Sequence, residues 1–311
     1  METPKTELNK KYLLVIAGPT AVGKTELSVR IAQHFNTVIL NADSRQVYKE
    51  LQIGTAKPTE QEMADVTHYF VGNLSLSEEY NAGKFEKDAL QLLQKLFKIH
   101  DIVILSGGSG MYIDAVCNGL DDLPKVSKEV RLQLEKELQT KGLPSLLIEL
   151  EEKDPEYFKQ VDKANPRRVT RALELIRESG EKYSELRKSL AKPRFFTTIK
   201  IGLHREREEL YERINLRMDQ MLDAGLFEEA KKYLSYKQTN ALQTVGYKEI
   251  YGFLDGAYNW EETVRLLKRN TRRFAKRQMT WFRKDDSYTW FHPKQIKEII
   301  EHIKEQIETA N

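Results

Sequence analysis

The segment from Gly18 to Thr25 constrains the fold of this chain more than any other. It reads Gly-Pro-Thr-Ala-Val-Gly-Lys-Thr and matches the complete phosphate-binding loop pattern. The apolar run Tyr12–Ala17 precedes it, and a helical pattern follows from Lys24 to Phe35. Such a succession of strand, loop and helix is typical of α/β folds built on a parallel sheet. We therefore predict a P-loop NTPase-like parallel sheet core.

The same loop predicts a binding chemistry. Its backbone N–H groups can turn toward one anion, and the N-terminus of the following helix favours negative charge. Lys24 adds a positive charge directed at the same oxygens, and the hydroxyl of Thr25 is suited to hold Mg²⁺. The sequence thus indicates a site for a phosphate compound, without saying which one.

Two further apolar runs, Val38–Leu40 and Ile102–Leu105, are separated by a helical pattern from Phe85 to Phe97. This order indicates strands of one parallel sheet joined by crossover helices. Motor and switch NTPases usually have an aspartate at the end of a second strand, but here Ile102–Leu105 runs into Ser106-Gly-Gly108. A motor-type ATPase is therefore disfavoured, whereas a small-molecule kinase with ATP as donor stays open.

Beyond Gly119 the sequence changes to lysine- and glutamate-rich helical patterns interrupted by prolines. We predict a helical insertion domain there, followed by a return to the core that begins with the apolar run Phe195–Ile201. The expected divisions are a polar N-terminal tail (1–11), the first part of the P-loop core (12–120), the helical insertion (121–195), the core return with basic C-terminal helices (196–292) and a final helix (293–311).

Asp43 follows the predicted strand Val38–Leu40, so it lies at the same carboxyl edge of the sheet as the P-loop. An aspartate at this position is either a turn former or a general base toward an acceptor substrate. Polar and cationic neighbours in Asp43–Gln46 and in Gly54–Pro58 favour the functional interpretation.

Composition restricts the remaining possibilities. Cys117 is the only cysteine, which excludes an intrachain disulfide and a cysteine-rich zinc site, and no histidine pair has a spacing typical of a metal site. No apolar run is long enough for a membrane span, so we expect a cytoplasmic protein with no membrane association. The net charge of +3 is too small to indicate nucleic-acid binding by itself.

Charge is nevertheless concentrated near the C-terminus. From Arg265 to Lys284 there are nine basic residues and no acidic ones. Arg265, Arg269, Arg272 and Lys276 share one helix face, and the apolar residues Leu267, Phe274 and Trp281 lie on another. The pattern predicts a helix that packs on the core and presents cations to a phosphate backbone, although a solvated basic face would look similar. The three tryptophans, Trp260, Trp281 and Trp290, are expected to be core residues.

Seven segments, in this order along the chain, resemble the tRNA dimethylallyltransferase family. They are Gly18–Thr25, Asn41–Tyr48, Ile53–Pro58, Gly107–Tyr112, Asn165–Arg171, Val245–Tyr247 and Arg277–Arg283. The resemblance spans about residues 12–283, and the absence of a C-terminal zinc finger resembles the bacterial members.

The resemblance implies transfer of the dimethylallyl group of dimethylallyl diphosphate to N6 of the adenosine next to the 3′ side of the tRNA anticodon. It implies Asp43 as general base, with Lys24, Thr25 and Mg²⁺ acting on the diphosphate leaving group. The diphosphate-binding residues would be Gly18, Pro19, Thr20, Ala21, Val22, Gly23, Lys24, Thr25 and Arg217.

The resemblance also implies contacts with the anticodon stem-loop of tRNA. The corresponding residues are Asp43, Ser44, Arg45, Gln46, Ser109, Arg167, Arg168, Val169, Thr170, Arg171, Gln243, Thr244, Val245, Gly246, Tyr247, Lys248, Lys276, Arg277, Gln278, Met279, Thr280, Trp281, Phe282 and Arg283. Two alternatives to a tRNA-modifying enzyme are a P-loop small-molecule kinase and an adenylate isopentenyltransferase that uses a free nucleotide. A third is an RNA-binding protein with a degenerate P-loop. A monomer is expected.

Overall fold

The computed structural model describes residues 10–188 and 191–310, so most of the polar tail expected over residues 1–11 lies outside the described residues. The chain forms two compact units. The smaller unit is Asn118–Pro193, and the larger unit is formed by the segments up to Cys117 and from Arg194 onward.

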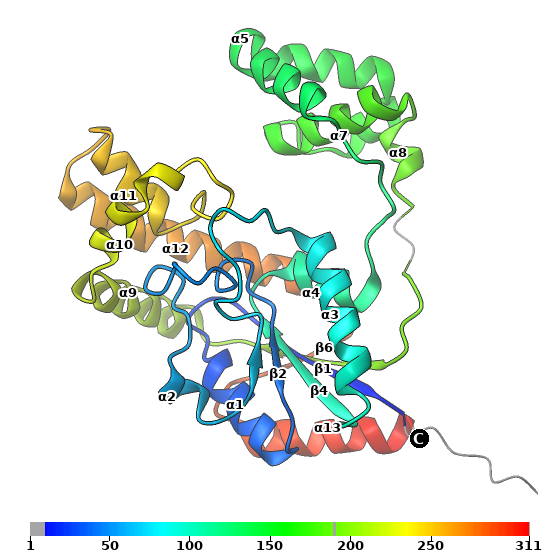
Figure 1. The fold of residues 1–311 in the computed structure, drawn as a ribbon, viewed down its shortest axis with the longest axis vertical. Coiled ribbons are helices and arrows are strands. Elements are labelled where there is room, and N and C mark those ends of the chain that lie inside the picture. Colours follow the sequence, from blue (N-terminus) through cyan, green and yellow to red (C-terminus); the bar gives the residue numbers. More distant parts are fainter. Residues whose placement is uncertain (1–9, 189–190, 311) are drawn as a thin grey trace, which may run out of the picture. The chain divides into compact units, whose positions relative to one another are not determined.

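A six-stranded parallel sheet lies at the centre of the larger unit, in the order β3-β2-β4-β1-β5-β6 (Figure 1). All six residues of β1 are buried, which explains why its sequence is continuously apolar. The predicted α/β class with a parallel sheet is confirmed. The strands are β1 (Tyr12–Ala17), β2 (Ile39–Asn41), β3 (His68–Tyr69), β4 (Ile102–Gly107), β5 (Thr197–Leu203) and β6 (Tyr288–Phe291).

Strands β3 and β6, at the two edges of this sheet, were not expected from the sequence. They contain two and four residues, which is too short for a periodic pattern to identify them. Their place is decided by pairing, because β3 extends β2 and β6 extends β5 in parallel register.

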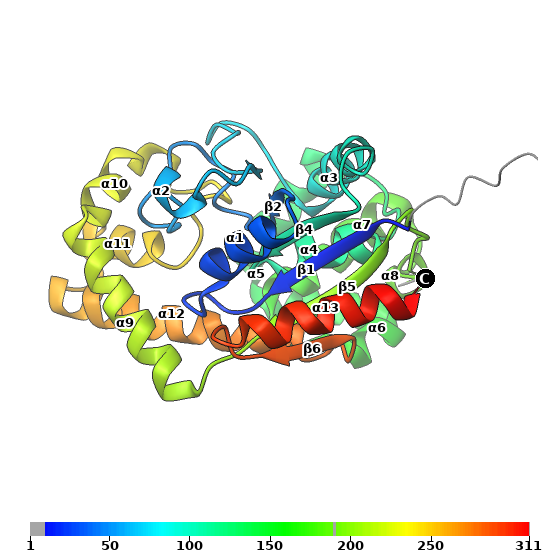
Figure 2. The same ribbon diagram turned by 90° about the horizontal axis from the view of Figure 1, so that it is seen from below.

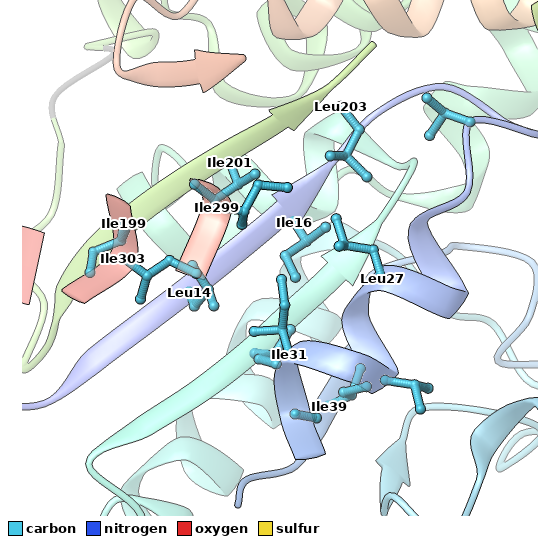
Figure 3. Packing of buried hydrophobic residues seen from close by; sticks show 14 of the residues in the cluster. Leu14, Ile16, Leu27, Ile31, Ile39, Ile199, Ile201, Leu203, Ile299 and Ile303 are labelled. Carbon is cyan, nitrogen blue, oxygen red and sulfur yellow. The ribbon is translucent and has the colours of Figure 1, made fainter. Parts of the chain in front are cut away.

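Helices α1 (Lys24–His34) and α13 (Ile296–Ala310) cover one face of the sheet, and α3 (Ala82–Leu96) and α4 (Gly110–Asn118) lie on the other face (Figures 1 and 2). The first pair buries isoleucine and leucine side chains against β1, β2 and β5 (Figure 3). This cluster fixes the start of α1, and thus the P-loop, over the end of β1. Its labelled members are Leu14, Ile16, Leu27, Ile31, Ile39, Ile199, Ile201, Leu203, Ile299 and Ile303.

A group of helices follows β5 at the carboxyl edge of the sheet. Its longest member, α12, is capped by Asn259, whose side chain accepts a hydrogen bond from the Glu262 N–H, and it contains most of the basic segment in which the sequence predicted a helix. Helix α12 packs on α9 and on α11, and α10 also contacts both α9 and α11. The helices are α9 (Arg207–Asp223), α10 (Leu226–Lys232), α11 (Tyr247–Leu254) and α12 (Trp260–Phe282), with a 3₁₀ turn over Leu234–Tyr236; the short α2 (Glu60–Met63) precedes β3.

The smaller unit consists of helices around a separate apolar core. Helix α5 is interrupted at Gly142, where φ is 77°, so its two halves change direction there. Leu146 and Leu150 of α5 pack against Val169 and Leu173 of α7. The helices are α5 (Lys128–Lys153), α6 (Pro155–Gln160), α7 (Pro166–Ser179) and α8 (Tyr183–Leu186).

Candidate active site

The P-loop connects β1 to α1 and is held from outside by two arginines that the sequence did not single out as ligands. Nε of Arg205 donates a hydrogen bond to the Val22 carbonyl oxygen over 2.8 Å, and Nε of Arg213 donates to the Ala21 carbonyl oxygen over 2.9 Å. Gly23, with φ at 109°, makes the left-handed turn into α1 that other residues rarely adopt. The carbonyl oxygens of Ala21 and Val22 are therefore engaged by side chains from outside the loop.

Lys24 is the first residue of α1 and points back across the loop. Its Nζ donates to the carbonyl oxygens of Gly18 and Pro19, each at 2.9 Å. Burial lowers the pKa of Lys24 to about 8; the negative charge of Asp43 opposes this shift and the positive charge of Arg217 adds to it. The ammonium is therefore poorly solvated and gains from any anion placed beside it.

Asp43, Lys24 and Arg217 lie within electrostatic reach of one another. Burial lowers the pKa of the partly buried Arg217 guanidinium, and Asp43 is the first group that opposes this shift. Two cations and one carboxylate from β1–α1, α9 and the loop after β2 thus share one site. The sequence proposed all three residues, and the structure brings them together.

Asp43 is a turn former, which is one of the two interpretations that the sequence left open. Its Oδ1 accepts hydrogen bonds from the N–H groups of Arg45 at 2.9 Å and Gln46 at 3.3 Å, which forms the turn. Among the described residues, nothing donates to the other carboxylate oxygen. One oxygen therefore fixes the side chain and the second can accept a proton.

Ser109 is hydrogen-bonded to the loop that carries Asp43. Its Oγ accepts from the Ser44 N–H over 3.0 Å and donates to Ser44 Oγ over 3.2 Å. Gly107 allows the two loops to approach closely, because a Cβ there would lie 2.2 Å from the Ala42 carbonyl oxygen. The contacts of Gly107 and Ser109 with this loop thus help to fix the position of Asp43 at the carboxyl edge of the sheet.

Thr25 has a free hydroxyl beside a small polar cavity. Among the described residues, its Oγ1 makes no hydrogen bond, and it lines a cavity of about 20 Å³ together with the oxygen-bearing side chains of Ser28, Asn41 and Ser106. Hard oxygen donors of this kind are those that Mg²⁺ prefers, so the residues present fit such an ion.

Several residues that the family resemblance assigned to tRNA have side chains engaged inside the protein. Tyr247 is fully buried and donates its hydroxyl to Glu229 over 2.6 Å, and Phe282 is 1% exposed. Gln278 is also buried and bridges the Thr20 N–H and the Gly108 carbonyl oxygen. Glu229 gave no sequence signal, because an isolated glutamate on a charged helix is usually solvated.

Helix α12 presents cations that lack carboxylate partners. Arg265 is paired with Glu262, and Arg272 donates to Asn215 over 2.6 Å. Among the described residues, no carboxylate pairs with the exposed side chains of Arg273, Lys276, Arg277, Arg283 and Lys284. Three of these residues lie on α12 and two follow its C-terminus directly; together the five are called the exposed cations of α12, and they form a surface that can hold phosphate groups.

The expectation of buried tryptophans was wrong for Trp260 and Trp281, each of which is 39% exposed. The indole N–H of Trp281 donates to Asp114 Oδ2 over 2.8 Å, so the ring lies across α4 with one edge in solvent. Helical spacing could not separate this half-exposed position from a core position.

The Arg167–Arg171 cluster belongs to the smaller unit. Pro166 begins α7, the Asn165 side chain caps it, and Arg167 and Arg168 are exposed in its first turn. Val169 is buried in the core of that unit, and Arg171 pairs with Glu174 over 2.9 Å.

Parallel strand order, the P-loop and a carboxylate at the same sheet edge define a P-loop α/β enzyme. A family model described as IPP transferase matches residues 46–285, and the chain therefore belongs to the IPP transferase family. The resemblance to tRNA dimethylallyltransferases found in the motifs is confirmed by curated relatives of that name. The chain is 52% identical over 298 residues to the one from Cytophaga hutchinsonii (96% of this chain, 98% of that protein) and 47% identical over 300 residues to tRNA dimethylallyltransferase 1 from Bacteroides fragilis (96% and 100%).

Solved structures agree with this family. The full-length tRNA isopentenylpyrophosphate transferase from Bacillus halodurans is similar with a TM-score of 0.72 at 37% identity, covering 96% of this chain and 98% of that one. A eukaryotic dimethylallyltransferase acting on tRNA is similar with a TM-score of 0.71 at 30% identity, covering 87% and 69%. None of the described helices has the length and apolar character needed to cross a membrane.

Proposed function

We propose that this enzyme transfers the dimethylallyl group of dimethylallyl diphosphate to N6 of the adenosine next to the 3′ side of the tRNA anticodon. The observation that carries the proposal is the convergence of Lys24, Arg217 and Asp43, with the exposed cations of α12 in the same unit. Family membership supplies the reaction class.

The cationic side of the site acts on the leaving group. As the bond between the allylic carbon and the diphosphate oxygen breaks, negative charge grows on the diphosphate. Lys24 and Arg217 stabilise that charge, and they do so strongly because burial has removed part of their own hydration. Mg²⁺ held by the Thr25 hydroxyl would neutralise part of the same charge.

The carboxylate side acts on the acceptor. The adenine N6 forms the new bond to the allylic carbon and loses a proton, which the unoccupied oxygen of Asp43 takes up. The other Asp43 oxygen remains hydrogen-bonded to Arg45 and Gln46 N–H groups, so the base keeps its orientation during the transfer. Diphosphate and prenylated tRNA are the products.

Binding of the anticodon stem-loop is proposed to rest on phosphate contacts. Each unit offers its own cationic face: the exposed cations of α12 in the larger unit, and Arg167 and Arg168 in the smaller one. The target base must leave its stack, which costs a few kcal/mol and is offset by these contacts. We further propose that the enzyme acts as a cytoplasmic monomer.

The test is incubation of the protein with Mg²⁺, dimethylallyl diphosphate and unmodified tRNA, followed by mass spectrometry of the nucleosides. We expect a dimethylallyl mass gain on adenosine, and a loss of about 10²- to 10⁴-fold in turnover for Asp43→Asn, which retains the turn-forming oxygen but not the base. A parallel reaction with free AMP separates tRNA modification from nucleotide prenylation. Phosphoryl transfer from ATP without prenylation would instead support the kinase alternative.

A further inference from the structure

Gln278 of α12 connects the P-loop to the loop that follows β4. Its Oε1 accepts a hydrogen bond from the Thr20 N–H over 2.9 Å, and its Nε2 donates to the Gly108 carbonyl oxygen over 2.8 Å. The side chain is only 7% exposed. Both polar ends of the amide are therefore satisfied by backbone groups inside the protein.

One loop is proposed to bind the diphosphate, and the other contacts the turn that orients the proposed base, Asp43. Thr20 belongs to the P-loop, which holds the diphosphate. Gly108 precedes Ser109, whose N–H donates to the Ala42 carbonyl oxygen over 3.2 Å and whose Oγ contacts Ser44. Through these bonds Gln278 links the diphosphate loop to the turn that orients Asp43.

The geometry allows only one orientation of the amide. The oxygen must face the Thr20 N–H and the nitrogen must face the Gly108 carbonyl, because the reverse would oppose like groups at both ends. A backbone group buried at this position without its partner would be costly, so the bridge fixes the separation of the two loops. It also means that the Thr20 N–H is engaged by Gln278 in this structure, while the Val22 N–H donates to the Pro19 carbonyl oxygen within the loop.

We propose that Gln278 is a positioning residue that holds the P-loop and the Gly108–Ser109 loop in register, and that it makes no contact with tRNA. This inference rests on the proposed function, because the register matters only if the diphosphate leaves at the P-loop while Asp43 receives the proton. Gln278 places the allylic carbon and the base at a fixed separation, and near-attack geometry of this kind governs the rate of the bond-forming step.

Gln278→Met tests the proposal, since methionine has a similar length and fills the same volume without either hydrogen bond. Steady-state kinetics with dimethylallyl diphosphate and tRNA should show kcat reduced by about 10- to 100-fold and KM for the donor raised, while the Kd of tRNA changes less than about twofold. Binding of inorganic pyrophosphate with Mg²⁺, measured by calorimetry without tRNA, should be weakened. Gln220→Met, on an exposed position of α9, is the matched control and should behave like the wild type.

A second variant breaks the same bridge from the opposite loop. In Gly108→Ala the new Cβ would lie 2.4 Å from Gln278 Nε2, so the amide must move. If Gln278→Met does not fold, as judged by circular dichroism, Gly108→Ala carries the test and should show the same split between kcat, donor KM and tRNA Kd.

The possible results separate the two proposals. An inactive wild type would refute the proposed function. An active wild type with unchanged kcat and donor KM in both variants would overturn the positioning role. The same is true if Gln278→Met weakens tRNA binding while the donor KM stays the same, because Gln278 would then be an RNA contact.

Discussion

The Tyr247 hydroxyl donates a 2.6 Å hydrogen bond to Oε1 of Glu229, which joins α11 to α10 through a buried side chain. The Glu229 carboxylate also accepts the N–H groups of Gln52, Ile53 and Gly54 at 2.8 to 2.9 Å. One carboxylate therefore organises the loop after Leu51.

That loop is tied in turn to the Asp43 turn. Gln46 Nε2 donates to the carbonyl oxygens of Thr55 and Ala56, each at 3.0 Å, and the Gln46 N–H donates to Asp43. Helices far along the chain thus help to hold the candidate base.

Tyr247→Phe removes one donor from Glu229 and leaves the packing unchanged. We expect the free energy of unfolding to fall by about 1–2 kcal/mol, because a hydrogen bond to a charged group is lost. The Kd for tRNA should remain within about twofold, since the hydroxyl is buried. Urea unfolding and filter binding measure these quantities, and Tyr236→Phe, at a 38% exposed position, is the control. Loss of tRNA affinity at unchanged stability would show that the hydroxyl contacts RNA.

The pKa of Lys24 makes anion binding depend on pH. A bound diphosphate stabilises the ammonium, so binding takes up a proton once the pH exceeds about 8, the pKa of Lys24 in this structure. We expect the affinity for pyrophosphate to fall up to roughly tenfold per pH unit above that value. Calorimetry in two buffers of different ionisation enthalpy measures the proton uptake. Lys24→Met should remove this component; proton uptake that persists in the variant would assign it to another group.

Stability responds to the same group with the opposite sign. Between about pH 8 and the ordinary lysine value of 10.5, unfolded Lys24 holds its proton more tightly than folded Lys24 does. The unfolded state then binds more protons, so the contribution of Lys24 to the free energy of unfolding rises with pH in this window. Urea unfolding of the wild type and Lys24→Met at pH 7.5 and 9.5 measures it. A difference between the two proteins that does not change with pH would contradict the assigned shift.

Removal of three exposed cations of α12 tests the RNA surface. The triple change of Arg273, Lys276 and Arg277 to alanine should weaken tRNA binding and lower the slope of log K against log salt by about 2 to 3. Arg272 is left in place because its contact with Asn215 is internal. The control removes the same charge from α13 and the residues before it by changing Lys294, Lys297 and Lys304 to alanine. Equal salt slopes in the wild type and the α12 variant would exclude these residues as phosphate contacts.

Arg177 is predicted to stabilise the smaller unit. Its guanidinium donates to both oxygens of Glu137, at 3.0 and 2.9 Å, and to Glu149, and the hydrogen bonds to Glu137 lower the pKa of that carboxyl to about 2. Arg177→Gln should reduce local stability by about 1–3 kcal/mol, measured as hydrogen exchange of amides in α5 and α7 of the full chain. Lys182→Gln, which removes an exposed pair with Glu185, should cost less than about 1 kcal/mol.

The pH dependence of the Arg177 effect follows from the lowered pKa of Glu137. The contribution of Glu137 is complete above the ordinary glutamate value of 4.5 and is lost as the pH falls toward about 2. The difference between the wild type and Arg177→Gln should therefore shrink over that range. A difference that stays constant down to pH 2 would show that Arg177 acts through packing alone.

The sequence by itself determined the features that depend on local order along the chain. The P-loop could be read because strand, glycine turn and helix are adjacent, and α12 because 23 residues give a long periodic pattern between clear ends. The motif around Asp43 and the family resemblance that included Arg217 identified candidate residues for the site.

Only the tertiary structure decided which side chains are available to a ligand. Gln278 and Tyr247 stand in segments that resemble RNA-binding motifs, yet both are buried and bound to groups distant in sequence. Glu229, Arg205 and Arg213 gave no such signal, although they hold the loops that carry the site. The physical reason is the same in each case. A backbone N–H or carbonyl can be satisfied by any side chain of the right polarity, and only the packing of β5, α9 and α12 against the P-loop selects which one.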